Sequence, residues 1–89
     1  MKIEIQTSRL TSELDRLAAF SATELPAVTR VVFSGEDLGA REWLEGLYAD
    51  AGLAVREDAV GNTFARWIGS EPEAGAVGTG SHIDAIPHS

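Results

Sequence analysis

Both histidines of the chain lie in the stretch GTGSHIDAIPHS (Gly78–Ser89), and an aspartate follows the first of them at the second position. Side chains two residues apart in an extended backbone point to the same side, so the imidazole of His82 and the carboxylate of Asp84 can lie close together. A metal-bound histidine commonly donates its other ring N–H to a carboxylate, which makes the ligand nitrogen more basic. The spacing therefore indicates a metal-binding histidine with an orienting carboxylate.

A simpler interpretation stands beside this one, because an exposed histidine bonded to a nearby aspartate is common. A catalytic zinc ion typically has three protein ligands and an open position. The other histidine, His88, follows a proline that breaks regular structure, and we expect it to be a loop residue. His82 and Asp84 alone do not make a metal site.

Two helices should precede this motif. The first carries one apolar face, and Ser8 or Thr11 could supply its N-cap oxygen. The second, within Glu36–Ala51, is the clearer one, since Ser34 and Asp37 form a variant of the capping box and Gly52 suits a left-handed C-cap. The apolar positions at helical spacing are Leu10, Leu14, Leu17 and Ala18 in the first, and Ala40, Trp43, Leu44, Leu47, Tyr48 and Ala51 in the second.

After Gly52 the pattern alternates, which predicts one strand around Leu53–Val55 and a second over Thr63–Ile68, joined by a turn at Gly61–Asn62. The small apolar run Ala76–Ser81 predicts a buried third strand. His82 and Asp84 would then follow the carboxyl end of that strand, where ligands bind in open α/β sheets.

The run around Arg30, VTRVV, predicts a further short strand at Val31–Phe33. Arg30 itself could reach a substrate, but a surface position on that strand is the better-supported expectation. With this strand, the fold class is α/β, with two helices followed by strands of an incomplete mixed sheet.

Length and charge limit the classes of function. The chain has 89 residues, enough for one small domain, and no cysteine for a disulfide. Its formal net charge of −7 argues against nucleic acid or an anionic membrane as a partner. No apolar run approaches a membrane span, and no signal peptide is visible, so we expect a cytoplasmic protein.

Three stretches together resemble the amino-terminal end of the M20-type metallo-amidohydrolases. They are TRVVFSGEDLGAREWL, AGLAVREDAVGNTFAR and GTGSHIDAIPHS, in the order and spacing of that family. The ending AIPHS is most similar to the allantoate and ureidoglycolate amidohydrolase branch. The N-carbamoyl-L-amino-acid hydrolases are close relatives with a similar sequence in this stretch, and β-ureidopropionases are a further possibility.

The resemblance implies a zinc-peptidase-like (phosphorylase/hydrolase-like) catalytic domain with two divalent metal ions, zinc or manganese. His82 matches the first metal ligand, and Asp84 matches the catalytic acidic residue that orients it. The implied reaction is attack of a metal-activated water on a ureido or carbamoyl amide. The implied substrate is a small molecule, allantoate or an N-carbamoyl-L-amino acid, and the complete enzyme would be a homodimer.

Members of this family are several times longer than residues 1–89. Their bridging aspartate, their general base, their remaining ligands and their dimerisation domain would lie beyond Ser89. We therefore expect the amino-terminal part of one catalytic domain, inactive on its own. Two alternatives stay open: an aminoacylase or peptidase of the same fold, and a non-catalytic α/β binding domain that pairs through the helix Glu36–Ala51.

Overall fold

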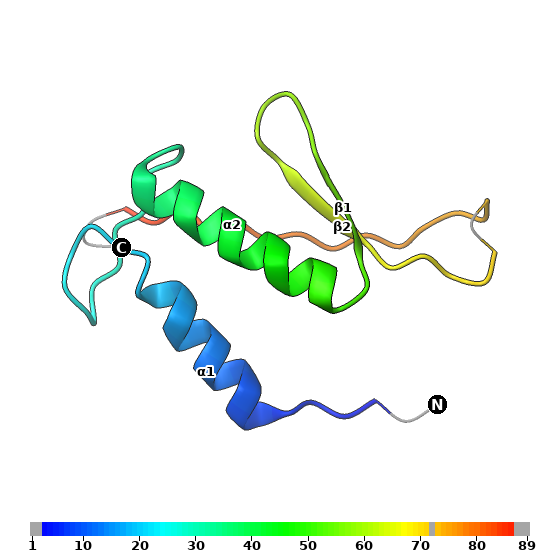
Figure 1. The fold of residues 1–89 in the computed structure, drawn as a ribbon, viewed down its shortest axis with the longest axis horizontal. Helices are drawn as coiled ribbons and strands as arrows, with labels where there is room; N and C mark the ends of the chain where they lie inside the picture. The colour runs from blue at the N-terminus through cyan, green and yellow to red at the C-terminus, as the bar shows by residue number, and fades with distance from the viewer. Residues whose placement is uncertain (1–2, 72, 87–89) are drawn as a thin grey trace. The chain divides into compact units, whose positions relative to one another are not determined.

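The computed structural model describes residues 3–71 and 73–86, and its elements are labelled in Figure 1. They are the helices α1 (Thr7–Ala18) and α2 (Gly35–Asp50) and the strands β1 (Ala54–Glu57) and β2 (Thr63–Arg66). The chain divides into two compact units. One comprises the residues up to Ala40 with those from Ile83 onward, and the other runs from Arg41 to His82.

Helix α1 begins earlier than its hydroxyl residues suggested. Its N-cap is Gln6, in an extended conformation, and the carbonyl of Gln6 accepts the first helical bond from the Leu10 N–H at 3.0 Å. The prediction of Ser8 or Thr11 as N-cap is wrong, because both already lie inside the helix. The apolar face is as expected, and at the end of α1 the ring of Phe20 lies so close to Gly39 that a Cβ there would meet it at 3.3 Å.

The connection from α1 to α2 is held by hydroxyl groups. The Thr29 N–H donates to Ser21 Oγ at 3.0 Å, the Thr23 hydroxyl donates to the Thr29 hydroxyl at 3.2 Å, and the Ala22 N–H donates to the Thr29 carbonyl at 2.9 Å. The expected strand at Val31–Phe33 is absent. The chain turns there instead, because the Ser34 N–H bonds back to the Val31 carbonyl at 3.0 Å.

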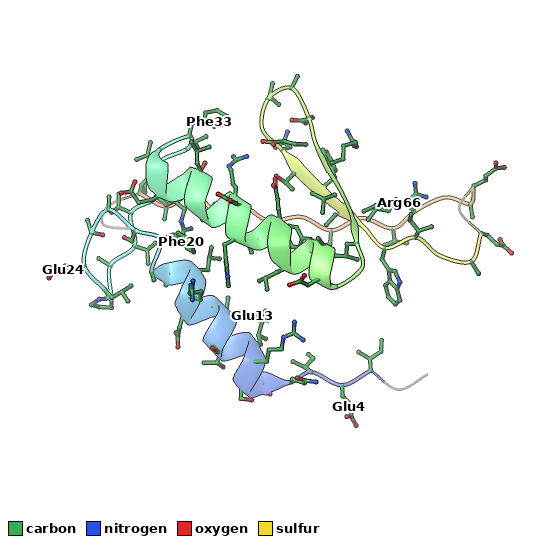
Figure 2. The ribbon with its side chains drawn as sticks, viewed as in Figure 1. Glu4, Glu13, Phe20, Glu24, Phe33 and Arg66 are labelled. Carbon is green, nitrogen blue, oxygen red and sulfur yellow. The ribbon has the colours of Figure 1, made fainter. Side chains whose placement is uncertain are left out.

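Both predicted ends of α2 are confirmed. At its start the Asp37 N–H donates to Ser34 Oγ at 3.3 Å. The Asp37 carboxylate accepts from the N–H of Phe33 at 2.9 Å, one residue earlier than a capping box requires, and Phe33 takes a left-handed φ of 64°. Figure 2 shows Phe33 just ahead of the helix. At its end Gly52 has a φ of 80°, as a left-handed C-cap requires.

The predicted hairpin is also confirmed. Strands β1 and β2 pair antiparallel, in a register that sets Ala54 opposite Arg66 and Glu57 opposite Thr63. The turn is built around Asp58, whose carboxylate accepts from the N–H of Val60 at 3.1 Å and from the N–H of Asn62 at 2.8 Å. The short side chain of an aspartate commonly closes a turn in this way.

The predicted third strand is not formed. Ala76–Ser81 is coil with exposed side chains, and Val77 is fully exposed. The sheet of the described residues is therefore a two-stranded antiparallel one rather than part of a mixed sheet. Small and apolar composition predicts burial only where a neighbouring strand supplies hydrogen bonds, and Gly78 and Gly80 give the run little strand preference of its own.

Polar groups dominate the buried part of the described residues. The one buried hydrophobic residue among them is Ala40, whereas Thr29, Arg30 and Asp37 are also buried. Hydrogen bonds to these three side chains therefore do much of the positioning that an apolar core usually does. In residues 3–71 and 73–86, no helix has the length and apolar character needed to cross a membrane.

Candidate functional site

The two predicted site residues lie in a segment without regular secondary structure. His82 is exposed, whereas Ile83, Asp84 and Ala85 are half-buried. The expected placement at the carboxyl end of a third strand is wrong, since that strand does not form. What positions the segment instead is an isolated antiparallel bridge between Ala85 and Arg30.

Arg30 contacts this segment through both its backbone and its side chain. Its backbone N–H donates to the Ala85 carbonyl, and the Ala85 N–H donates to the Arg30 carbonyl, each at 2.9 Å. Its guanidinium also donates through Nη1 to the carbonyl of Ile83. Asp84 thus lies between two residues that Arg30 binds.

The same guanidinium binds the end of α1. Its Nε donates to the Phe20 carbonyl at 2.9 Å, and its Nη2 donates to the Leu17 carbonyl at 2.7 Å. The Leu17 carbonyl also accepts from the Phe20 N–H at 3.1 Å, and a cation is favourable near the last carbonyls of a helix. Only 4% of Arg30 is exposed, so the expectation of a surface strand residue is wrong.

The described residues do not complete a metal site. Among residues 3–71 and 73–86, no three His, Cys, Asp or Glu side chains form a group that could hold a metal ion. His82 offers one imidazole, and Asp84 offers a carboxylate two positions on. This donor set fits one ligand and its orienting group, and further ligands would have to come from other residues. His88 lies outside the described residues.

A second polar cluster closes the hairpin turn. Hydrogen bonds from the side chain and backbone of Asn62 hold the pKa of Asp58 below its usual value of 3.8, and the Val60 N–H and the charge of Arg56 act in the same direction. Arg41 Nη1 donates to the Gly61 carbonyl and lies 3.5 Å from Glu57 Oε1. These contacts all stay within the hairpin unit, and they explain the turn without a ligand.

Sequence reasoning missed the role of Arg30. The available signal was an arginine in the middle of VTRVV, where the flanking apolar residues favour a side chain that is not fully in water. The carbonyl groups that it binds carry no mark in the sequence. The bond from the Phe33 N–H to Asp37 was missed because the capping-box pattern points to the N-cap residue instead.

Several curated relatives of the chain are named as hydrolases of ureido or carbamoyl compounds. It is 51% identical over 85 residues to "Ureidoglycolate hydrolase" from Oryza sativa subsp. japonica, covering 96% of this chain and 18% of that protein. It is 43% identical over 81 residues to an N-carbamoyl-L-amino-acid amidohydrolase from Paenarthrobacter aurescens (91% and 19%). It is 32% identical over 85 residues to the allantoate amidohydrolase of Bacillus subtilis (96% and 20%).

Solved structures agree with the sequence matches. Two crystal structures of AtUAH, one in complex with glyoxylate and one with (S)-hydroxyglycine, match with a TM-score of 0.92 and 49% identity. The match covers 96% of this chain and 20% of each crystallised chain. A scan against models of protein families finds no match.

These findings confirm the resemblance at the level of a group of enzymes. The chain belongs to the group of amidohydrolases that contains the allantoate and N-carbamoyl-L-amino-acid enzymes. Ureidoglycolate hydrolases are also among its relatives. The chain spans about a fifth of the length of the curated relatives it matches.

Proposed function

We propose that this chain is the amino-terminal part of an M20-type catalytic domain that hydrolyses the ureido C–N bond of a small substrate, ureidoglycolate or allantoate. The observation that carries the proposal is the 51% identity to a ureidoglycolate hydrolase over nearly the whole chain. The complete protein would act as a homodimer in the cytoplasm.

The bound molecules of AtUAH favour ureidoglycolate between these two substrates. Hydrolysis of the ureido carbonyl of ureidoglycolate consumes one water and releases hydroxyglycine, carbon dioxide and ammonia. Loss of ammonia from hydroxyglycine then leaves glyoxylate. The two molecules found in the AtUAH crystals are thus the successive products that this reaction would give.

In the complete protein His82 would bind one of two divalent ions, zinc or manganese, and Asp84 would orient its imidazole. The ions would lower the pKa of a bound water and polarise the ureido carbonyl. The exposure of His82 supports this role, because the ring is accessible to a ligand, while Asp84 beside it is half-buried. The Arg30 bonds on both sides of Asp84 give its backbone a fixed position.

An N-carbamoyl-L-amino acid is the second candidate substrate, supported by the 43% identity to the Paenarthrobacter enzyme. The reaction is the same, because the carbamoyl group of an N-carbamoyl amino acid and the amino nitrogen that carries it together form a ureido group. An aminoacylase or peptidase would instead cleave an amide that has no terminal NH₂ on its carbonyl carbon.

A chimera tests the proposal. Residues 1–89 would replace the matching stretch of the rice ureidoglycolate hydrolase, and ammonia release would be measured with ureidoglycolate, allantoate and an N-carbamoyl-L-amino acid. We expect ammonia from at least one of these three substrates, and no acetate from an N-acetyl amino acid assayed beside them. A folded chimera that is inactive on all three, while the unmodified rice enzyme is active, would contradict the proposal.

A further inference from the structure

One buried cation ties together two parts of the chain that are far apart in sequence. The guanidinium of Arg30 donates to Leu17 and Phe20 at the end of α1 and to Ile83 beside the candidate site. The backbone of Arg30 holds Ala85 through two bonds of 2.9 Å. All of these residues belong to one compact unit.

We propose that Arg30 is a positioning residue for the segment Ile83–Ala85, and that it sets the place of Asp84 relative to α1. The effect of this positioning on catalysis rests on the function proposed above. The positioning itself does not, because it depends only on the contacts of this unit.

The contacts require an arginine rather than any cation. A guanidinium offers five N–H donors in a rigid planar fork, whereas an ammonium is a point charge on a flexible stem. Arg30 uses three different nitrogens for three carbonyls that lie in different directions. A lysine at this position could satisfy one of those directions well, but not all three together.

The position of Asp84 follows from these bonds. The carbonyl before it and the amide after it are both bound to Arg30, so its backbone cannot rotate freely without breaking one of them. A side chain that orients a metal ligand must be held by its own surroundings to within a fraction of an ångström. His82 lies just outside the anchored stretch and is exposed.

Amide hydrogen exchange in the full 89-residue chain tests the positioning. The probe is the Ala85 N–H, and the reference is the Ala22 N–H, which bonds to Thr29 in the same unit without touching the Arg30 side chain. In Arg30→Ala we expect Ala85 to exchange at least about tenfold faster, with Ala22 much less affected. In Arg30→Lys the exchange rate of the Ala85 N–H should lie between those of the unmodified chain and Arg30→Ala. Arg41→Ala, in the other unit, should leave this rate unchanged.

Two outcomes would overturn the inference. One is an unchanged Ala85 exchange rate in Arg30→Ala. The other is an equal acceleration of Ala85 and Ala22, which would mean that Arg30 only stabilises the unit as a whole.

A zinc titration separates this inference from the proposed function. The ring signals of His82 would be followed by NMR as zinc is added to the same variants. We expect half-saturation to require several-fold more zinc in Arg30→Ala than in the unmodified chain or Arg41→Ala. No response of His82 in any variant would count against its metal role and leave the exchange rates to decide on Arg30. Equal responses in all variants would contradict the link between Arg30 and the site.

Discussion

The carboxylate of Asp58 accepts two hydrogen bonds from Asn62, one from the backbone N–H at 2.8 Å and one from the side-chain amide at 2.9 Å. The side-chain bond is the largest cause of the lowered pKa of Asp58. Asn62→Ala should therefore raise the pKa of Asp58 toward its usual value. Arg56→Gln should raise it less, because the charge of Arg56 is the smallest of the causes. An NMR titration of the Asp58 carboxyl would measure both.

The same bonds make the turn sensitive to acid. The folded-state pKa of Asp58 lies below its unfolded value, so its stabilising contribution is present above the usual value of 3.8. That contribution is lost as the pH falls through the lowered folded-state pKa. Exchange of the Asp58 N–H, which bonds to the Asn62 carbonyl at 2.9 Å, should report this loss after correction for intrinsic rates. Equal protection of the Asp58 N–H above the usual value of 3.8 and below the lowered folded-state pKa would contradict a stabilising role for the Asp58 carboxylate.

Arg41 should stabilise the hairpin mainly through its bond to the Gly61 carbonyl. A hydrogen bond from a charged donor contributes about 1.5–3 kcal/mol, whereas an exposed ion pair contributes about 0.2–1 kcal/mol. The partner in the ion pair, Glu57, is half-exposed at 3.5 Å from Arg41. We expect Arg41→Ala to cost at least about 1 kcal/mol of local stability and Glu57→Gln less than about 0.5 kcal/mol. Hydrogen exchange in β1 and β2 checks the order, which would be reversed if the ion pair dominated.

A glycine within α2 and a glycine just after its end should respond to alanine in opposite ways. Gly52 has a φ of 80°, where an L-residue is strained by about 1–2 kcal/mol. Gly46 lies within α2 with open space where a Cβ would be, so alanine there should favour the helix by up to about 1 kcal/mol. Circular dichroism at 222 nm should show less helix for Gly52→Ala and more for Gly46→Ala. A gain of helix in Gly52→Ala would contradict the C-cap assignment.

The apolar face of α1 should make the 89-residue chain associate. No residue of this helix is buried, and Leu10 and Leu14 are 46% and 57% exposed. Apolar area removed from water stabilises a contact by about 25 cal/mol per Å². Sedimentation velocity should show the average mass rising with concentration, and less so in a Leu10→Gln, Leu14→Gln variant than in an Arg16→Gln control. A monomer at all concentrations would contradict this expectation.

Local signals accounted for the parts of the fold that depend on nearby residues. Ser34, Asp37 and Gly52 mark the ends of α2, because a capping residue interacts with backbone groups only a few positions away in the sequence. The hairpin followed from alternation and from the turn at Gly61–Asn62. In contrast, the strand predicted at Ala76–Ser81 needed a distant partner, and no local pattern could supply one.

The candidate site shows the same division. His82 and Asp84 could be singled out from their spacing alone, because the relation is local. Arg30 could not, because its partners are backbone carbonyls at Leu17, Phe20 and Ile83, and every residue type carries a carbonyl. Contacts of this kind become visible only when the chain is folded.

We propose that His82 binds a metal ion in a hydrolase of ureido compounds. The most direct test of this proposal compares His82→Ala with His88→Ala in the rice-enzyme chimera, measuring bound zinc or manganese and ammonia release from ureidoglycolate. We predict that His82→Ala loses bound metal and nearly all ammonia release, whereas His88→Ala keeps both. Full metal content and activity in His82→Ala would contradict the claim.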